Sequence, residues 1–452
     1  MSAKDWSEIF KWRVDDDGVT ITKFLQKNAT SVDVPSEIDG KPVVAIGDHA
    51  FYRSLFLNYS SLTKVSLPEG LKTIGFKAFS GCESLTEVSF PEGLQTIGEW
   101  AFSKCKALTK VSLPAGLQTL GDEAFWDCSS LTEVSLPAGL QTLGVEAFAQ
   151  CSSLTEVSLP EGLQTIGESA FSDCKSLLNF LVAKGNANFR SVDGVLFSAD
   201  GKKLLKYPVG RQKTEYVVPD GVVEIADSAF SGCSSLTKVS LPKGLKTIGF
   251  KAFSECSSLT EISFPKGLKT IGFRAFSDCK SLMEVSFSQG LKTLGESAFS
   301  GCSSLTKVSI PKGSLPKGLQ TIGESTFSGC SSLTKVLLPK GLKTIGKKAF
   351  SGCSSLTKVS FPEGLQTIGG EAFSGCSSLT EVSFPSGLQT IGDEAFFGCK
   401  SLGNVAFPKG VKISKNVFGR ELPPEFESQA SRDPFYWAKR GGVYADWGNP
   451  FF

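Results

Sequence analysis

The chain has 452 residues, 47 of them basic and 45 acidic, so its formal net charge of +2 lacks the strong basic bias of a dedicated nucleic-acid binder. Hydrophobic residues make up 40%, enough for a long core, but no apolar run approaches the roughly 18 residues that cross a membrane. The single histidine, His49, excludes multi-histidine metal sites and argues against classical Ser or Cys hydrolase chemistry. The N-terminus has no apolar h-region, so we expect no cleaved secretory signal.

The first segment, residues 1–41, is predicted to form a β-hairpin cap. The stretch FKWRVDDDGVTITKF carries a hairpin signal at Asp17-Gly18, a typical turn pair. A strand pair here would cover the open edge of the repeats that follow. The acidic run before Gly18 does not match a calcium loop, because Arg13 and Phe24 stand where an EF-hand needs acidic residues.

Thirteen cysteines indicate an internal repeat. They form three groups, and within each group neighbouring cysteines are 23 residues apart. The groups are Cys82, Cys105, Cys128, Cys151 and Cys174; then Cys233, Cys256, Cys279 and Cys302; then Cys330, Cys353, Cys376 and Cys399. Tyr59 lies 23 residues before the first cysteine and gives a fourteenth copy. Repeats of this period typically belong to a solenoid.

The unit ESLTEVSFPEGLQTIGEWAFSKC is typical of the copies. Its L-x-x-V-x-F pattern predicts an extended segment, Pro91 and Gly93 turn the chain, and Leu94 and Ile97 start a second extended piece. The Ala-Phe pair and the cysteine then favour a short helical or 3-10 turn. A unit this short cannot bury its apolar face alone, so the copies should stack into one continuous core with a parallel sheet along one side.

The recurring LTEVSFPEGLQTIGEWAFSKC and its relatives, over roughly residues 42–420, resemble the BspA-like class of leucine-rich repeats. The resemblance implies a right-handed, curved stack of about 14 short repeats, with the parallel β-sheet on the concave side and the short turns on the other side. It also implies an adhesin or interaction protein, because such roles predominate in that class. The scaffold itself dictates no ligand.

Two interruptions divide the repeat region. Between Cys174 and Cys233 the interval is 59 residues, and Asp200-Gly201 there separates two apolar runs, which predicts a β-hairpin. We therefore expect a first repeat arm at 42–182, a hairpin insertion at 183–218 and a second arm at 219–420. Between Cys302 and Cys330 the interval is 28, because SLPKG is duplicated, and this addition should bulge from one edge.

The last segment, residues 421–452, is an aromatic-rich tail that departs from the repeat. Its aromatic residues are Phe435, Tyr436, Trp437, Tyr444, Trp447, Phe451 and Phe452. One interpretation is a C-terminal cap that folds over the last repeat. The other is a docking peptide whose aromatic side chains anchor in a partner's pocket, as such residues do at interface hot spots. The sequence leaves both open.

Charge is distributed unevenly along the chain. Residues 1–174 carry a net of −10 and residues 233–350 a net of +11, so head-to-tail self-association is a further hypothesis. Two repeat positions beside the Pro-Gly turn stack lysines on one edge. They are Lys243, Lys266, Lys312, Lys317 and Lys340, with Lys246, Lys269, Lys292 and Lys343. This edge is either a solvated surface or a site for an anionic partner: an acidic protein, a sulfated glycan or an anionic membrane. Nucleic acid is not favoured, because the edge lacks interleaved aromatic residues.

The outward positions of the first extended segment mix Lys and Glu, which suits protein recognition. The cysteines lack any C-x-x-C pair and lie beside Ala-Phe, so we expect buried, reduced thiols and a cytoplasmic or other reducing compartment. Export to the cell surface by an unrecognised route is the alternative. His49 occupies a solvent-facing position. With no catalytic, metal or cofactor motif, the chain reads as a non-enzymatic protein-interaction scaffold, or else as a surface adhesin that binds a glycan or another anionic ligand.

Overall fold

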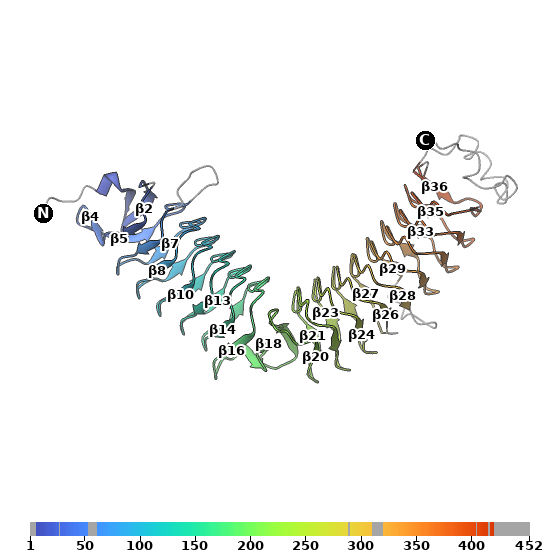
Figure 1. The fold of residues 1–452 in the computed structure, drawn as a ribbon, viewed down its shortest axis with the longest axis horizontal. Coiled ribbons are helices and arrows are strands. Elements are labelled where there is room, and N and C mark those ends of the chain that lie inside the picture. The colour runs from blue at the N-terminus through green and yellow to red at the C-terminus, as the bar shows by residue number, and fades with distance from the viewer. Residues whose placement is uncertain are drawn as a thin grey trace. The chain divides into compact units, whose positions relative to one another are not determined.

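A computed structural model describes residues 6–26, 28–52, 61–287, 290–309, 320–403, 405–414 and 416–419. The chain divides into two compact units, Met1–Arg211 and Gln212–Phe452. Within each unit, short strands stack turn upon turn, as the ribbon in Figure 1 shows. No helix in these ranges is long and apolar enough to span a membrane.

Each turn of the stack contributes two short strands, which face opposite sides of a shared core. In the turn after Cys105, Leu108, Val111, Leu117 and Leu120 are all buried. The intervening polar residues point outward, so apolar and polar positions alternate as a half-buried strand requires. Because a single turn could not bury these side chains, the strands are stabilised by the turns above and below.

The first strand of each turn usually centres on a buried valine, and we call this set the valine strands. In the first unit they are β3 (Ser31–Asp33), β6 (Lys64–Ser66), β8 (Glu87–Ser89), β10 (Lys110–Ser112), β12 (Glu133–Ser135), β14 (Glu156–Leu159) and β16 (Asn179–Val182). In the second unit they are β20 (Glu215–Val217), β22 (Lys238–Ser240), β24 (Glu261–Ile262), β26 (Glu284–Ser286), β28 (Lys307–Ser309), β30 (Lys335–Leu337), β32 (Lys358–Ser360) and β34 (Glu381–Ser383).

The second strand of each turn usually begins with threonine, and we call this set the threonine strands. In the first unit they are β5 (Lys41–Ile46), β7 (Thr73–Ile74), β9 (Thr96–Ile97), β11 (Thr119–Leu120), β13 (Thr142–Leu143) and β15 (Thr165–Ile166). In the second unit they are β21 (Glu224–Ile225), β23 (Thr247–Ile248), β25 (Thr270–Ile271), β27 (Thr293–Leu294), β29 (Thr321–Ile322), β31 (Thr344–Ile345), β33 (Thr367–Ile368), β35 (Thr390–Ile391) and β36 (Lys412–Ile413).

Neighbouring turns pair in parallel, with equivalent residues opposite one another. Thr119 lies opposite Thr142, and Val111 lies opposite Val134. A residue therefore faces the residue of the same repeat position in the next turn. Because of this register, the residues at one repeat position form a straight column along the stack. The same residue type at that position in successive repeats therefore forms a continuous row on the surface.

A column of stacked phenylalanine rings forms the centre of each unit, and we call it the phenylalanine spine. In the first unit the rings lie 4.6 to 5.9 Å apart along Phe51, Phe79, Phe102, Phe125, Phe148 and Phe171. In the second they lie 4.7 to 5.7 Å apart along Phe230, Phe253, Phe276, Phe299, Phe327, Phe350, Phe373 and Phe396. Such offset stacking adds to the free energy gained by burying the rings.

The N-terminal segment packs on the end of the first spine. It contains a 3-10 helix, η1 (Trp6–Glu8), an antiparallel pair formed by β1 (Phe10–Asp15) and β2 (Gly18–Phe24), and the short strand β4 (Glu37–Ile38). Strand β2 also pairs in parallel with β5. The ring of Phe24 stacks on Phe51 at 5.0 Å, so this hairpin covers the first aromatic ring of the spine.

The segment around Asp200-Gly201 is an antiparallel meander of three strands. The sequence predicts β18 (Val195–Ser198) and β19 (Lys203–Lys206), and the structure adds β17 (Phe189–Val192). Arg211, which follows this meander, is held at the start of β16. Its Nε donates to the carbonyl oxygen of Leu178 (2.7 Å), and a terminal nitrogen donates to Asn179 Oδ1 (2.9 Å).

The solenoid fold is confirmed, with two differences in detail. It has about 16 turns, because segments without a cysteine, such as those carrying β3 and β20, also join the valine strands. Among the described residues η1 is the only helix, so hydrogen-bonded turns replace the expected helical ones. Residues with left-handed backbone recur there, such as Lys77 (φ 51°) and Trp100 (φ 58°), and these end any right-handed helix.

Candidate partner-binding site

Five of the predicted lysines gather on three neighbouring turns of the second unit. Lys246, Lys269 and Lys292 precede β23, β25 and β27, and their backbones are joined directly. The amide of Lys269 donates to the carbonyl oxygen of Lys246 and that of Lys292 to Lys269, both at 2.8 Å. Lys243 and Lys266 lie in the preceding Pro-Gly turns. We call these five residues the lysine cluster.

The side chains of the lysine cluster are exposed, and none forms an ion pair with any described residue. The two columns converge, since a Cβ placed on Gly267 would lie 2.8 Å from Nζ of Lys246. The ammonium group of Lys246 therefore lies over the turn that carries Lys266. Because the cluster has no ion pairs, it is a surface with unbalanced positive charge, and its like charges on neighbouring strands repel one another.

The other predicted site residues do not join the cluster. Lys343 bonds through its backbone to Gln320 and Gln366, so a neutral side chain lies on either side of it in its column. Lys340 is exposed two repeats beyond Lys292. Lys312 and Lys317 lie outside the described residues, as do Phe435, Tyr436, Trp437, Tyr444, Trp447, Phe451 and Phe452.

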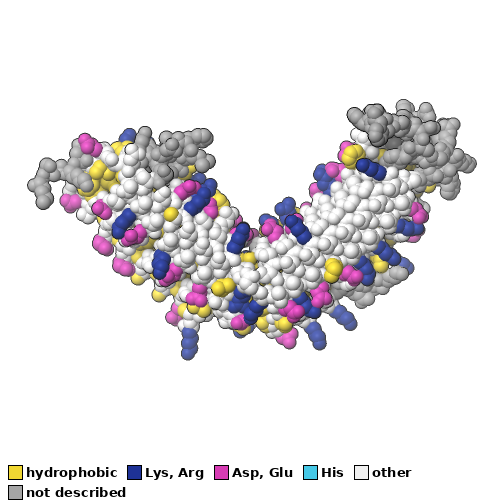
Figure 2. All heavy atoms as spheres, in the orientation of Figure 1, with side chains coloured by type: hydrophobic (Ala, Val, Ile, Leu, Met, Phe, Trp, Pro, Cys, Tyr) yellow, Lys and Arg dark blue, Asp and Glu magenta, His cyan; other side chains and the backbone are white. Residues whose placement is uncertain are grey.

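The charged residues of the valine strands, unlike those of the lysine cluster, mostly form ion pairs. Most outward Lys and Glu residues of these strands pair between neighbouring strands, although Lys335 lies between Lys307 and Lys358. On the face in view in Figure 2 basic and acidic side chains are intermixed. The pairs are Lys64–Glu87 (3.0 Å), Lys110–Glu133 (2.9 Å), Lys238–Glu261 (2.6 Å), Lys307–Glu284 (3.3 Å) and Lys358–Glu381 (2.8 Å). Exposed pairs of this kind stabilise the fold only slightly, but they leave little net charge on that face.

The first unit carries a row of carboxylates on the turns that follow its threonine strands. Glu99, Asp122, Glu123, Glu146 and Glu168 supply at least one carboxylate to each of four consecutive turns, and we call them the acidic ridge. The turns are joined by backbone bonds from Glu123 to Val145 (2.8 Å) and from Glu146 to Glu168 (3.0 Å). None of the five forms an ion pair within the part of the chain that the structure describes.

The electrostatics of Glu123 show how closely the acidic ridge is packed. Partial burial raises the pKa of Glu123, and the negative charge of Glu146 raises it further. The charges of Glu99 and Asp122 act in the same direction, and Lys77 only partly offsets them. The positive charge of Lys77 therefore does not balance the negative charge around Glu123.

Two half-buried indoles accompany the acidic ridge, and the sequence reasoning missed them. Trp100 and Trp126 lie 5.9 Å apart between ring centroids. Lysine ammonium groups already rest on both: Lys77 Nζ is 5.0 Å from Trp100, and Lys104 Nζ is 5.3 Å from Trp126. The aromatic residues stand at repeat positions that hold Glu or Ser in other copies, and this departure was the signal available in the sequence.

A comparable aromatic pair lies on the second unit, close in sequence to the lysine cluster. Phe250 and Phe273 stack at 5.7 Å, with Lys251 over the first ring and Arg274 over the second. Phe273 remains 38% exposed. Aromatic rings with cations over them therefore stand just beyond β23 and β25, at the ends opposite to the cluster lysines Lys246 and Lys269.

The cysteines are buried and none is part of a disulfide bond, as predicted. Each thiol for which the bond is seen donates to a phenylalanine carbonyl of the preceding turn, as Cys353 does to Phe327 at 3.2 Å. Burial raises the pKa of Cys353 and Cys399 to about 12. These thiols are neutral at physiological pH, and they act as small core side chains.

The remaining candidates for chemistry among the described residues are the single histidine and the potential metal ligands. His49 is exposed, as predicted, and packs against Tyr52 and Phe76. No group of three His, Cys, Asp or Glu side chains in the described ranges is arranged to hold a metal ion.

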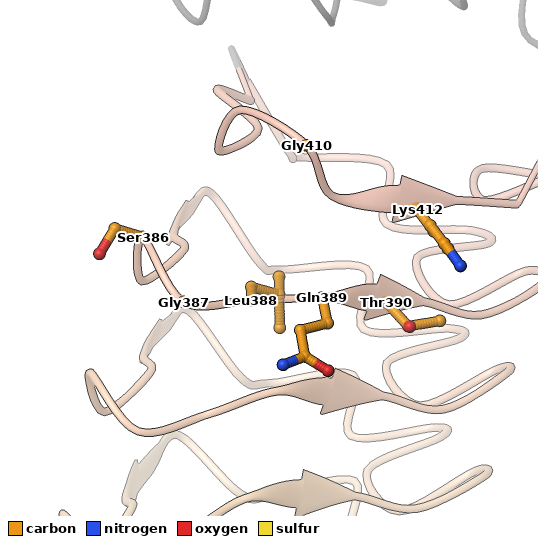
Figure 3. Close-up of a pocket in the computed structure, with 7 residues that line it drawn as sticks. All are labelled: Ser386, Gly387, Leu388, Gln389, Thr390, Gly410 and Lys412. Carbon is orange, nitrogen blue, oxygen red and sulfur yellow. The ribbon is translucent and has the colours of Figure 1, made fainter.

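A depression of about 400 Å³ lies near the end of the second unit, lined by Ser386 to Thr390 of one turn and by Gly410 and Lys412 of the next (Figure 3). Here the repeat is one residue shorter, because PKGVKI replaces PSGLQTI. As a result Lys412, instead of a threonine, lies opposite Thr390. The depression is therefore a local effect of the shortened turn.

The chain matches the family described as a BspA type leucine-rich repeat region over residues 44–178, 211–314 and 312–422. It belongs to this family. A comparison with curated proteins finds no match. Membership suggests a protein-interaction or surface scaffold role, and members of BspA type are typically non-enzymatic binding proteins.

Solved structures of similar proteins support the same fold. A leucine-rich repeat protein from Eubacterium ventriosum is 21% identical, with 90% of this chain and 98% of that chain covered and a TM-score of 0.65. The pneumococcal vaccine antigen PcpA is 24% identical, with coverage of 85% and 94% and a TM-score of 0.63. A leucine rich cell surface protein from Faecalibacterium prausnitzii is 25% identical, with coverage of 85% and 94% and a TM-score of 0.51.

Proposed function

We propose that this BspA type protein is a non-enzymatic scaffold that binds an acidic protein partner through the lysine cluster. The observation that carries the proposal is the contrast between the two sets of strands. Most charges on the valine strands are paired, with Lys335 and Glu156 as exceptions, whereas Lys246, Lys269 and Lys292 stack without a carboxylate. An acidic partner would relieve this repulsion and would gain several charge-assisted contacts at once.

Phe250 and Phe273, which stand at the other ends of the short strands that Lys246 and Lys269 precede, would add a non-electrostatic part to the contact. Exposed aromatic rings beside cations are typical of binding surfaces, where they supply apolar contact area at little cost in entropy. A partner that presents carboxylates together with an apolar side chain therefore fits better than a uniform polyanion. This feature favours a protein partner over a sulfated glycan or an anionic membrane.

The test is a titration of a fluorescent Glu-rich peptide with the full chain and with the variant K246E/K269E/K292E. We expect the affinity to fall at least about tenfold, because each reversal replaces an attraction with a repulsion. The matched control is K280E/K347E/K400E, which makes the same change in net charge at exposed lysines of the second unit outside the cluster. Equal loss of affinity in both variants would refute the proposal, because only net charge would then matter.

The aromatic tail remains a second proposed docking element, or else a cap, and it lies outside the described residues. Affinity capture from native extract, with the full chain and with a chain ending at Arg420, distinguishes a docking role of the tail from a capping role. A partner lost only with the tail would assign docking to Phe435–Phe452. A partner retained by the shortened chain but lost by the lysine variant would place docking on the repeats.

We also propose that the protein works in a reducing compartment, on the grounds that its thirteen cysteines are buried and none is part of a disulfide bond. The alternative, a surface adhesin, is favoured by the 25% identical relative whose name describes a cell surface protein. Protease treatment of intact source cells distinguishes them. Digestion of the protein without lysis would establish surface exposure and would overturn the proposed compartment.

A further inference from the structure

The lysine cluster and the acidic ridge have the same spacing. Both are built from residues that recur once per repeat, and in both the neighbouring turns are joined by backbone hydrogen bonds. The distance between successive charges is therefore set by the stacking of turns, at about 4.8 Å in each row. The ridge carboxylates are divided between two adjacent repeat positions, Glu99, Asp122 and Glu168 at one and Glu123 and Glu146 at the other, so the ridge and the lysine cluster match turn by turn along the stack.

Neither row has ion-pair partners among the described residues, although Glu99 accepts a hydrogen bond from Trp100 (2.9 Å) and Asp122 accepts one from the amide of Val145 (2.7 Å). No ion pair among the described residues joins a lysine of the cluster to a carboxylate of the ridge, and neither row is paired internally. The ridge additionally offers Trp100 and Trp126. The ammonium groups of Lys77 and Lys104 that lie on these indoles show that this surface accepts lysine side chains.

We propose that the lysine cluster of one copy binds the acidic ridge of a second copy. This inference rests on the proposed function and names its partner, because the acidic protein is then another molecule of the same chain. Lys246, Lys269 and Lys292 would each face a carboxylate on successive turns, with Glu123 and Glu146 at the centre of the contact. Charge complementarity and equal pitch select this occupant over an unrelated acidic surface.

The contact joins different surfaces of the two copies. After one contact forms, the first copy still presents a free ridge and the second a free cluster. Such a heterologous contact continues to grow unless its geometry closes a ring. The expected species are therefore short chains of molecules whose average length rises with protein concentration.

Sedimentation velocity of the full chain at about 50 mM and about 500 mM salt provides the test, because high salt screens exposed charges. We expect the sedimentation coefficient to rise with concentration at low salt and to return to the monomer value at high salt. Both the lysine variant K246E/K269E/K292E and the ridge variant E123K/E146K/E168K should be monomeric at low salt. The control K280E/K347E/K400E should associate as the original chain does.

Charge exchange makes the test specific. A single chain that carries both sets of reversals should associate again, because an acidic cluster then meets a basic ridge. An equimolar mixture of the two variants, each monomeric alone, should form chains in which the variants alternate, because one kind of contact between them is native and the other is the reversed pair. Circular dichroism confirms folding, and if E123K or E146K disturbs it, the exposed pair E99K/E168K replaces the ridge variant.

Several outcomes would overturn the proposal. These are a monomer at low salt for the original chain, undiminished association of either variant, or a folded double-reversal chain that stays monomeric. If the original chain is monomeric but still binds the Glu-rich peptide through its lysine cluster, self-association is wrong and the proposed function stands. If the peptide also fails to bind, both are wrong.

Discussion

Two positions in most turns hold residues with left-handed backbone. The first precedes the Ala-Phe pair and is occupied by many residue types, including Trp100 and Glu146. The second precedes the cysteine and is glycine in many copies, such as Gly352 (φ 72°), but lysine at Lys104 (φ 59°). A left-handed backbone costs a residue with a side chain about 1–2 kcal/mol. The packing of each turn must offset this cost to allow the sharp reversal of the chain.

Replacing Gly352 with alanine should lower the free energy of unfolding by about 1 kcal/mol. The added Cβ would meet nothing closer than Gly329 at 3.6 Å, so the cost lies in the backbone and not in a clash. Gly341→Ala is the matched control, because Gly341 does not have a left-handed backbone and has open space around its Cβ position. Urea denaturation of both variants checks this, and equal stability would contradict it.

The buried thiols predict a loss of stability at alkaline pH. The pKa of Cys174, Cys353 and Cys399 is raised to about 12, chiefly by burial. In the unfolded chain these thiols ionise near pH 8.5, so above that pH the folded state holds protons that the unfolded state has lost. The free energy of unfolding should fall between about pH 8.5 and 12, by about 1.4 kcal/mol per pH unit for each such thiol.

Urea midpoints measured at pH 7.5 and at pH 10 test this expectation. The midpoint should be lower at the higher pH, and the variant Cys353→Ala should show a smaller decrease because it has one fewer thiol to ionise. A midpoint that does not change, or a decrease equal in both chains, would show that the thiols are not responsible.

The phenylalanine spine links the turns into continuous elements. Phe276 stacks on Phe253 at 5.0 Å and on Phe299 at 5.1 Å, and it is fully buried. Its side chain therefore belongs to three turns at once. Loss of one ring weakens the contact of a turn with both of its neighbours, which is how stability is distributed in a stack of repeats.

Phe276→Ala should destabilise the protein by about 3–5 kcal/mol, as removal of a buried aromatic side chain typically does. Phe273→Ala, three residues earlier in the same turn, removes a ring that is 38% exposed and should cost about 1 kcal/mol or less. Thermal melts of the two variants provide the comparison. Similar losses would show that burial in the spine is not the source of stability.

At this scale the sequence predicts the fold well because every turn repeats the same apolar positions. The columns of Leu, Val, Phe and Cys follow directly from the 23-residue spacing. Strand β17 was not predicted, since its residues Phe189–Val192 follow no repeat and become a strand only by pairing with β18. The form of the turns also escaped prediction, because left-handed backbone at residues such as Lys77 has no reliable sequence signal.

The candidate site was only partly predictable. The lysine columns follow from the repeat period, and the structure brings five of those residues together. The separation of Lys343 from them, by Gln320, depends on which turns are neighbours after the duplicated SLPKG. The indoles at Trp100 and Trp126 were missed because their repeat positions differ, and only folding brings two such positions within 6 Å.

For the whole molecule, the repeat makes neighbouring turns interchangeable. A cut between Gly352 and Cys353 and another between Gly375 and Cys376 remove one whole 23-residue repeat. The remaining ends carry the same residue types as before, so Phe350 can stack on Phe396 and Lys335 can pair with Glu381. The molecule would simply be one turn shorter.

We therefore expect the chain lacking residues 353–375 to fold, with an unchanged circular dichroism spectrum per residue and a slightly lower melting temperature. The control lacks residues 353–374 and differs by a single residue. It shifts the phase of every later position, which directs apolar side chains outward, so it should aggregate or lose part of its structure. Equal folding of both chains would show that the register is not essential.

The interchangeability of turns also bears on how the chain reaches its structure. The segment SSLTKVS occurs at 60–66, 234–240, 303–309 and 354–360, so a strand emerging from the ribosome meets several earlier strands that fit it equally well. The pair β1–β2 and the meander β17–β19 have sequences found nowhere else in the chain, and a turn beside them has one correct neighbour. Because these segments have unique sequences, they fix the pairing register of the turns beside them. An error in register can then extend only over the repeats between them.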